Sequence, residues 1–294
     1  MDVAVTGAAG FIGSRMVEHL RAQGHSVLAL TRDDCDLSTT VPDFAGCSVV
    51  YHFAADMGGV GYFSAHDWWP PIVNGRITAN VMQACAEQGV KRAFFAASAC
   101  AYPTEGQRRR GRAPLLSEDM LEHGQPDQMY GREKLMMLRL AERAPFDARV
   151  GILHTVYGDP VDRGPRTKFP TAIVRKVLAA RETGVVPVWG DGSQLRSYLW
   201  IDDAVRKIER VMGDGYRGPV NIGYQGAVSV AQVVHLVCAL VGVEPRIEYD
   251  TSAPAGVAGR DCDNAKFWNL YGDMEPTSYA DGFGRLISAV EATA

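Results

Sequence analysis

Short apolar segments alternate with longer amphipathic segments along the first half of the chain. The segments between the apolar runs repeat their hydrophobic positions with a period near 3.6, which is typical of helices. Five apolar runs have the length and composition of buried strands, at residues 3–5, 26–30, 48–53, 92–97 and 148–154. Strand and helix in alternation predict a parallel sheet covered on both faces, which is an α/β, doubly wound fold.

The alternation stops after residue 158. Four prolines fall between residues 159 and 190, and beyond them come an apolar run at 219–223, a helical pattern at 229–241 and an extended segment at 245–249. We predict that residues 1–158 and part of 190–225 form the sheet domain. Residues 159–190 and 226–294 are expected to form a smaller, discontinuous lobe over the carboxyl ends of the strands, where open α/β sheets bind ligands.

Composition narrows the class of protein. The chain has 294 residues, a net charge of −4 and a pI near 6.0, so we expect neither nucleic acid nor an anionic membrane as a partner. The six cysteines have no Cys-x-x-Cys spacing, which favours reduced thiols over a disulfide framework. The N-terminus has no signal-peptide pattern, and no apolar run approaches about 18 residues. We therefore expect a cytoplasmic protein.

A glycine-rich turn follows the first predicted strand and opens a helix that reaches about residue 23. Its sequence at residues 6–13 is Thr-Gly-Ala-Ala-Gly-Phe-Ile-Gly. In a dinucleotide-binding turn the first glycine allows the tight bend, the second brings the backbone close to the pyrophosphate, and the third lets the helix pack on the strand. We therefore assign cofactor binding in a Rossmann domain to Gly7, Gly10, Phe11, Ile12 and Gly13.

Two cofactors are compatible with the segment after the second predicted strand. An acidic residue that binds the adenosine ribose is the usual NAD signal there, whereas this chain has Leu-Thr-Arg-Asp-Asp at residues 30–34. The guanidinium of Arg32 would suit the 2′-phosphate of NADP. The prediction is therefore a tightly bound, catalytic NAD or NADP, with Ala54 after the third strand as a further contact.

A tyrosine and a lysine four residues apart indicate hydride-transfer chemistry. Tyr130 and Lys134 share one face of a predicted helix, and Ser98 follows the fourth strand. The lysine ammonium is expected to lower the phenol pKa, so that Tyr130 takes a proton from a substrate hydroxyl while Ser98 hydrogen-bonds the same oxygen. Together with the glycine turn, these residues predict an NAD(P)-dependent enzyme.

Cys100 places a thiol two residues after Ser98, beside the predicted site of hydride transfer. A simple sugar dehydrogenase has no use for it. Oxidation of a ring carbon acidifies the neighbouring C–H bonds, and a thiol becomes an effective base once a nearby cation favours the thiolate. The sequence therefore favours an epimerase, with an inert buried thiol as the alternative.

The chain resembles the extended short-chain dehydrogenase/reductase family, the NAD-dependent epimerases and dehydratases, and among them the GDP-mannose 3,5-epimerases. The specific segments are Ala-Ala-Asp-Met-Gly-Gly at 54–59 and Ser-Ala-Cys-Ala-Tyr-Pro at 98–103. Further segments match at 130–134, 154–158, 189–197, 219–223 and 256–260. The resemblance implies a nucleotide-diphosphate sugar as substrate, a transient 4-keto sugar, a cofactor regenerated in each turnover, and a homodimer.

The resemblance also assigns roles to individual residues. It implies that Cys100 and Lys168 act as base and acid at C3 and C5 of the sugar, and that Arg196 and Arg260 bind the diphosphate. The implied contacts to the sugar are Met57, Gly58, Gly59, Ser98 and Thr155. The family has Asn at the position of Thr155 and an acidic residue at the position of Thr167, which leaves the stereochemistry of the substrate and the set of inverted centres open.

Other functions remain as alternatives. GDP-L-fucose synthases, which epimerise the sugar and then reduce C4 with NADPH, share the Ser-x-Cys and Tyr-x-x-x-Lys elements and resemble this chain at residues 31–33. A 4,6-dehydratase is disfavoured, because its usual acidic pair after the serine is replaced here by Ala99 and Cys100. A non-catalytic dinucleotide-sensing module is disfavoured by the intact Ser98, Tyr130 and Lys134.

Three polar features have plainer interpretations. His154 on the fifth strand is interpreted as an interior histidine rather than a catalytic acid. Asp202 and Asp203 are expected to start a helix near its positive end, and we predict no metal site. The basic run at residues 107–112 is interpreted as a solvated loop, with a lid over a phosphorylated substrate as the alternative.

Overall fold

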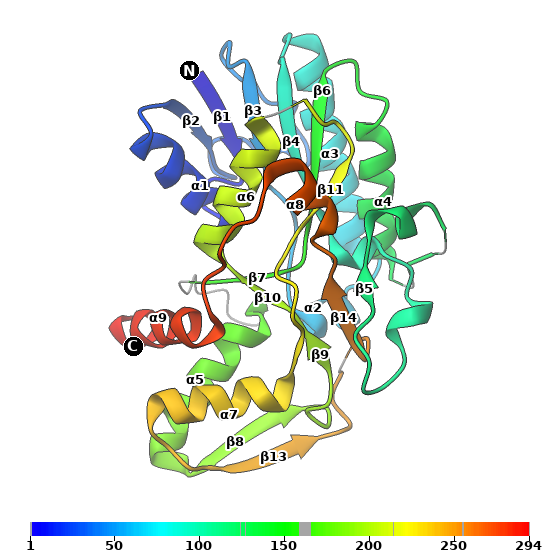
Figure 1. The fold of residues 1–294 in the computed structure, drawn as a ribbon. Coiled ribbons are helices and arrows are strands. Elements are labelled where there is room, and N and C mark those ends of the chain that lie inside the picture. Colours follow the sequence, from blue (N-terminus) through cyan, green and yellow to red (C-terminus); the bar gives the residue numbers. More distant parts are fainter. Residues whose placement is uncertain are drawn as a thin grey trace.

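The sheet domain is built on six parallel strands (Figure 1). The computed structural model describes residues 2–123, 125–126, 128–158, 166–213, 215–254 and 256–293. The order across the sheet is β11-β6-β4-β3-β1-β2, and the strands are β1 (Asp2–Thr6), β2 (Ser26–Leu30), β3 (Val49–His52), β4 (Arg92–Ser98), β6 (Asp147–Leu153) and β11 (Pro219–Ile222). This confirms the predicted doubly wound α/β fold.

Helices cover both faces of the sheet. Successive residues of a strand point to opposite faces, so each strand contributes side chains to both buried clusters. Val3 and Val5 of β1 belong to the buried cluster that contains helices α1 (Phe11–Ala22) and α6 (Ile201–Gly213). Ala4, between them, belongs to the cluster that contains α3 (Trp69–Glu87) and α4 (Met129–Ala141). The strands are therefore apolar on both faces, which is why they appear in the sequence as continuous apolar runs.

The five predicted strands are present, with ends that differ from the prediction by at most one residue. A further strand, β7 (Thr155–Tyr157), follows β6 almost directly. It pairs in parallel with β10 (Tyr198–Trp200). This pair carries the chain from the sheet domain into the smaller lobe.

The smaller lobe lies beyond the carboxyl ends of the strands (Figure 1). A four-stranded sheet has the order β12-β9-β14-β5, and β13 pairs with β8. These strands are β5 (Leu115–Leu116), β8 (Val185–Trp189), β9 (Leu195–Arg196), β12 (Val228–Ser229), β13 (Arg246–Asp250) and β14 (Gly259–Cys262). The remaining helices are α2 (Val60–Ala65), α5 (Phe169–Thr183), α7 (Val230–Val241), α8 (Ala265–Tyr271) and α9 (Tyr279–Ala292), with short 3-10 helices η1 (Ala99–Ala101), η2 (Glu105–Gln107) and η3 (Glu118–Glu122).

Helix α7 shows how local sequence sets the bounds of an element in the lobe. The hydroxyl of Ser229 accepts a hydrogen bond from the backbone N–H of Gln232, and the side-chain oxygen of Gln232 accepts one from the backbone N–H of Ser229. This capping box satisfies N–H groups that a helix start would otherwise leave unpaired. Gly242 ends the helix in the left-handed conformation, with φ of 76°. The predicted helix at 229–241 is therefore confirmed.

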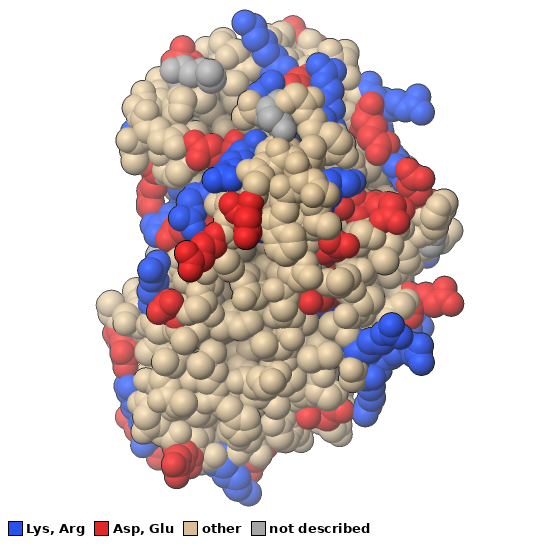
Figure 2. Space-filling view, in the orientation of Figure 1, with Lys and Arg blue, Asp and Glu red and all other residues tan. Residues whose placement is uncertain are grey.

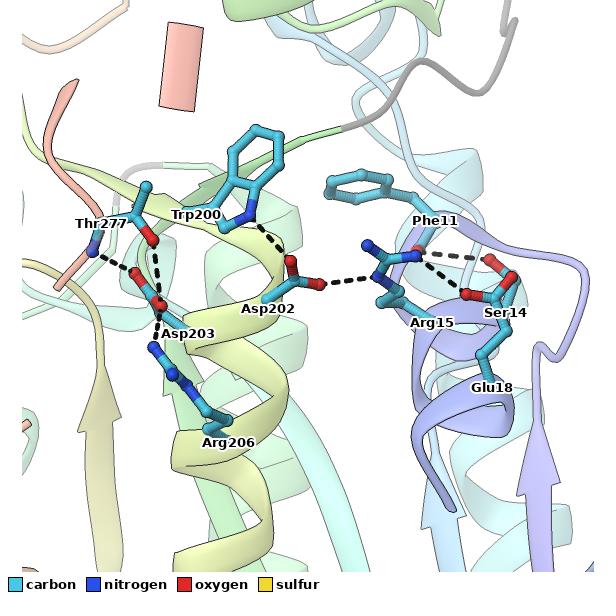
Figure 3. A network of polar contacts seen from close by, with 9 residues as sticks. All are labelled: Phe11, Ser14, Arg15, Glu18, Trp200, Asp202, Asp203, Arg206 and Thr277. Carbon is cyan, nitrogen blue, oxygen red and sulfur yellow. Dashed lines mark hydrogen bonds and ion pairs between the residues drawn. The ribbon is translucent and has the colours of Figure 1, made fainter. Parts of the chain in front are cut away.

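The two acidic residues at the start of α6 fasten three segments together (Figure 3). Asp202 accepts hydrogen bonds from Nε of Arg15 on α1 at 2.7 Å and from the indole N–H of Trp200 at 3.0 Å. Asp203 accepts one from the backbone N–H of Thr277, just before α9, at 2.7 Å. The carboxylates thus hold structure at the positive end of a helix. Among the described residues, no three His, Cys, Asp or Glu side chains are grouped as metal ligands would be.

Charged side chains of both signs are intermixed on the face shown in Figure 2, and uncharged residues cover most of the lobe there. Within the basic run at 107–112, residues 108–112 are exposed, and Arg110 pairs with Asp191 of the lobe at 3.1 Å. Nowhere in the described part of the chain is a helix both long enough and apolar enough to cross a lipid bilayer.

Candidate active site

A cavity of about 720 Å³ runs from the glycine turn to the start of α5. Its volume is that of a typical ligand site, and it lies where the carboxyl ends of β1, β3 and β4 meet. The predicted site residues that line it are Gly7, Gly10, Phe11, Ile12, Gly13, Arg32, Ala54, Met57, Gly58, Ser98, Tyr130, Lys134 and Lys168. The predicted residues outside its lining are Gly59, Cys100, Thr155, Arg196 and Arg260.

The glycine turn fits a dinucleotide. Gly7 has φ of 68°, and a Cβ there would lie 2.7 Å from the backbone nitrogen of Ala54. A Cβ on Gly13 would lie 2.1 Å from the carbonyl oxygen of Gly7. The first turn of α1 has no capping side chain, and its residues line the cavity. Backbone N–H groups and the positive end of the helix are therefore available to a pyrophosphate.

The ribose end of the cavity carries charges of both signs. Arg32, whose side chain is 84% exposed, pairs with Asp36 at 3.3 Å, and both residues line the cavity. A guanidinium suits the 2′-phosphate of NADP, and a carboxylate suits the ribose diol of NAD. This end of the cavity is compatible with both cofactors.

A buried histidine under the cavity was not predicted. His52 shares a hydrogen bond of 2.7 Å with the hydroxyl of Thr6, and both side chains are buried. Burial, assisted by the charge of Lys134, lowers the pKa of His52 to about 3. The ring is therefore neutral, and Lys134 has no charged histidine beside it.

Ser98, Tyr130 and Lys134 meet at the end of β4. The hydroxyl of Ser98 accepts from the backbone N–H of Cys100 at 3.2 Å. Tyr130 and Lys134 are both buried on α4, and Nζ of Lys134 lies 5.6 Å from the centroid of the Tyr130 ring. That ammonium pairs with the neighbouring Glu133 at 3.2 Å. Tyr130 and Lys134 therefore lie on one helix as predicted, but the ammonium of Lys134 forms an ion pair with the carboxylate of Glu133.

In this structure the pKa of Tyr130 is raised, whereas the sequence led us to expect that Lys134 would lower it. Burial raises the pKa of Tyr130 well above its usual value, the negative charges of Cys100 and Glu133 add to the rise, and a hydrogen bond with Ser98 opposes it. The ammonium of Lys134 pairs with Glu133, and Nζ lies 5.6 Å from the centroid of the Tyr130 ring. Nothing in the sequence indicated that Glu133 would form an ion pair with Lys134.

Cys100 is a half-buried thiol with a cation beside it. Nη1 of Arg260, on β14, lies 3.5 Å from its Sγ. Burial alone would raise the pKa of Cys100, but the charge and hydrogen bond of Arg260, the hydrogen bond with Ser98 and the charge of Lys168 together lower it. In contrast, burial raises the pKa of Cys85 to about 12. Cys100 therefore has the surroundings of a reactive thiol.

Lys168 lies on the cavity wall at the start of α5. It is the N-cap residue of that helix, its side chain is exposed, and its charge reaches Cys100. Gly59 packs against this segment, since a Cβ on it would lie 3.2 Å from the carbonyl oxygen of Thr167. The structure thus brings Lys168 and Cys100 within electrostatic reach of each other.

The two arginines predicted to hold a diphosphate are neighbours across two strands. Arg196 on β9 and Arg260 on β14 are in register in a parallel pair. Arg196 donates to the carbonyl oxygens of Leu195 at 2.8 Å and Val257 at 2.6 Å, and burial lowers its pKa to about 10, with Arg260 contributing. Two like charges side by side favour an anionic ligand. The contact between Arg260 and the thiol was not predicted.

His154 lies in the interior. Its Nε2 contacts the side-chain oxygen of Asn221 at 3.1 Å, and burial lowers its pKa to about 3. Asn221, which is fully buried, also accepts from the hydroxyl of Tyr102 at 2.8 Å. A neutral histidine in such a network orders the strand ends behind the site.

Sequence reasoning assigned no role to Asp56, Tyr62 and Arg166, which also line the cavity. Nη1 of Arg166 lies 2.6 Å from Oδ1 of Asp56, and the hydroxyl of Tyr62 donates to the same carboxylate at 3.0 Å. Asp56 and Arg166 stand in the segments that carry Met57 and Lys168, and this closeness in sequence was the available signal.

The chain matches known proteins over most of its length. The model of the NAD dependent epimerase/dehydratase family matches residues 3–223. GDP-mannose 3,5-epimerase 1 of Oryza sativa subsp. japonica is 33% identical, over 96% of this chain and 79% of that protein. GDP-L-fucose synthase 1 of Arabidopsis thaliana is 28% identical, over 96% of this chain and 91% of that protein. Among solved structures, MoeE5 in complex with UDP-glucuronic acid and NAD has a TM-score of 0.81 and 29% identity, and the match covers 100% of both chains.

Proposed function

The chain belongs to the NAD-dependent epimerase/dehydratase family, and from that membership we propose that it is a nucleotide-sugar epimerase similar to the GDP-mannose 3,5-epimerases. It acts through a transient 4-keto sugar. A GDP-hexose is the proposed substrate class, because a GDP-mannose 3,5-epimerase and a GDP-L-fucose synthase are among its relatives.

One observation carries this proposal. The thiol of Cys100 lies 3.5 Å from a guanidinium, and the backbone N–H of Cys100 donates to the hydroxyl of Ser98, which also hydrogen-bonds Tyr130. A dehydrogenase that only moves hydride needs no thiolate there. An enzyme that removes a proton from carbon needs a base, and the cation beside the sulfur favours a thiolate that can act as one.

The glycine turn, Arg32 and Lys134 would hold NAD or NADP, for the reasons given above. When bound, the cofactor would supply a hydride acceptor and donor for one ring carbon. The proton chemistry belongs to the protein. Ser98 and Tyr130 would bind the C4 hydroxyl, and Tyr130 would take its proton. For this the pKa of Tyr130 must fall from its raised value, and movement of Lys134 from Glu133 toward the phenol would lower it.

A ketone at C4 acidifies the C–H bonds at C3 and C5. The thiolate of Cys100 would remove one of these protons, and the ammonium of Lys168 would deliver another to the opposite face of the ring, so that the sugar keeps its proton count. The thiol and the amine must then exchange protons with solvent before the next inversion. Solvent hydrogen therefore enters the sugar at each inverted carbon.

Deuterium incorporation tests the proposal. The purified protein is incubated in D2O with GDP-mannose and with other nucleotide sugars, and NMR locates deuterium in the recovered sugar. Tyr130→Phe should lose both oxidation and exchange, whereas Cys100→Ser should still reduce NAD(P) but lose exchange at C3 and C5. Cys238→Ala, on α7 and away from the cavity, is the control. Full exchange by Cys100→Ser, or none by the parent protein with any sugar, would refute the proposal.

A specific observation supports a second candidate, an epimerase that then reduces C4 with NADPH. Arg32 lines the ribose end of the cavity, where its guanidinium suits NADP, and a GDP-L-fucose synthase is 28% identical to the chain. Stoichiometric consumption of NADPH with a GDP-4-keto-6-deoxy sugar would establish this activity. Exchange without net NADPH consumption would exclude it. A silent dinucleotide sensor would turn over no sugar in either assay.

A further inference from the structure

Asp56, Tyr62 and Arg166 form a closed polar cluster on the wall of the cavity, which we call the latch. The hydroxyl of Tyr62 lies 3.0 Å from both carboxylate oxygens of Asp56. Nη1 of Arg166 lies 2.6 Å from Oδ1 of Asp56, and its Nη2 donates to the Tyr62 hydroxyl at 3.0 Å. The guanidinium is also 4.2 Å from the centroid of the Tyr62 ring. An ion pair, a hydrogen bond and a cation–π contact thus hold one side chain.

The latch is anchored in the sheet domain through Asp56. The backbone N–H of Asp56 donates to the side-chain oxygen of Asn74 at 2.6 Å, and the side-chain N–H of Asn74 donates back to the carbonyl oxygen of Asp56 at 3.1 Å. Asn74 lies on α3 and is buried. The carboxylate of Asp56 is only 14% exposed. It is therefore fixed in place and poorly hydrated, whereas the side chain of Arg166 is 43% exposed, so solvent reaches the ion pair from one side.

Arg166, the other end of the latch, lies in the segment that carries Lys168. Arg166 stands two residues before Lys168. On the other side, α5 begins directly after Lys168, whose carbonyl oxygen accepts from the N–H of Ala172 at 3.0 Å. The backbone of Lys168 is thus held by a helix on one side and by the latch on the other.

Helix α2 connects the same latch to Tyr130. Phe63 follows Tyr62 on this short helix, and its ring stacks on that of Tyr130 with centroids 4.6 Å apart and an angle of 28°. Figure 1 shows α2 between the sheet domain and the lobe. A Cβ on Gly61 would lie 3.3 Å from the ring of Trp189 on β8, so α2 also contacts the lobe. Helix α2 therefore contacts Tyr130, the proposed base for the C4 hydroxyl, through Phe63. Through Tyr62 it contacts Arg166, which stands close to the proposed acid Lys168.

We propose that the latch positions Lys168 for proton transfer, with Arg166 as a positioning residue. The proposal rests on the proposed epimerase function. Arg166 cannot return a proton to carbon itself, because a guanidinium stays protonated at all relevant pH values. Lys168 can, but only if its amine lies within reach of the ring carbon, and misplacement by about 1 Å can lower a rate by about 100-fold.

The first test asks whether Arg166 acts through Lys168. Arg166→Gln is made in the parent protein and in Lys168→Met, which retains the exchange that Cys100 supports alone. Deuterium incorporation into the sugar should fall about tenfold or more in the first background and should not fall further in the second. Arg181→Gln is the matched control, because Arg181 forms a 2.7 Å ion pair with Glu291 at the far end of α5. An equal fall in both backgrounds would overturn the proposal.

The second test needs no turnover. Backbone amide hydrogen exchange is measured by mass spectrometry over residues 166–169 of the NAD-loaded protein without sugar. Arg166→Gln and Asp56→Asn should both accelerate exchange there, and Arg181→Gln should not. If the parent protein incorporates no deuterium into any sugar, the epimerase function fails while this result still decides whether the latch holds the segment. Unchanged exchange in both latch variants would overturn the latch.

Discussion

Replacing Arg260 with glutamine should make Cys100 a less reactive thiol. The guanidinium lies 3.5 Å from Sγ, and both side chains are partly buried. Unit charges at this distance attract by about 1 kcal/mol with the screening of bulk water and by about 5 kcal/mol at an effective dielectric constant of 20. Since about 1.4 kcal/mol corresponds to a factor of ten, loss of the charge should reduce the thiolate population at neutral pH at least about fivefold.

Alkylation by iodoacetamide measures this population, because the thiolate is the nucleophile. The rate at Cys100 is followed by mass spectrometry across a range of pH. Its profile should move to higher pH in Arg260→Gln, since the cation that lowers the pKa of Cys100 is gone. Cys35 is an internal control in every sample. It is half-buried, and burial together with Asp36 and Asp34 raises its pKa, so its slow labelling should not change.

Arg196→Gln provides the matched substitution. It removes the same charge from the neighbouring strand, but its guanidinium bonds to the carbonyls of Leu195 and Val257 and not to the thiol. Its effect on Cys100 should be smaller than that of Arg260→Gln. If Cys100 in Arg260→Gln is alkylated within twofold of the parent rate, Arg260 does not stabilise the thiolate, and the main support for Cys100 as the carbon base is lost.

Three further substitutions test the packing that supports the site. Gly131→Ala would place a methyl group 2.1 Å from the carbonyl oxygen of Cys100, and we expect thermal unfolding to show a loss of about 1–3 kcal/mol with slower deuterium exchange into the sugar. Asn221→Leu removes a buried amide that donates to two backbone carbonyls, and urea titration should show a loss of about 2–4 kcal/mol. Asp147→Asn leaves the buried Arg149 without its carboxylate and should cost about 3–5 kcal/mol at pH 7. Burial alone raises the pKa of Asp147, but its arginine partners lower it, so the stabilisation is present above about pH 4 and is lost as the pH falls through the lowered value. The difference between Asp147→Asn and the parent should therefore shrink in acid, and a difference independent of pH would contradict the ion pair as its source.

Features set by neighbours in the sequence were predictable. The strand at 26–30 depends on an apolar run, and the helix that starts after Ser229 depends on its apolar positions and on the capping box between Ser229 and Gln232. The glycine turn was also predictable from its spacing, although the contacts that require glycine are with Ala54 after β3 for Gly7 and with Gly7 itself for Gly13. Local sequence therefore predicted the fold and the glycine turn that lines the cavity.

Contacts between distant residues were not predictable from pattern. Nothing in the sequence places Tyr62 between Asp56 and Arg166, which are separated by 110 positions. The pairing of Lys134 with Glu133 depends on how deeply both are buried, which the helical spacing alone does not indicate. These are the interactions that set charge and position at the proposed site, so its electrostatics required the structure.

The thiol of Cys100 and the guanidinium beside it are 160 residues apart in the chain. Arg260 follows Cys100 in the chain, so the sulfur has no guanidinium beside it until β14 has been synthesised and has folded. In that interval the sulfur is an ordinary, weakly acidic thiol. The nucleophilic character expected of the sulfur depends on β14, the strand that carries Arg260. The raised reactivity expected of this thiol is therefore a property of the folded chain and not of the local sequence around Cys100.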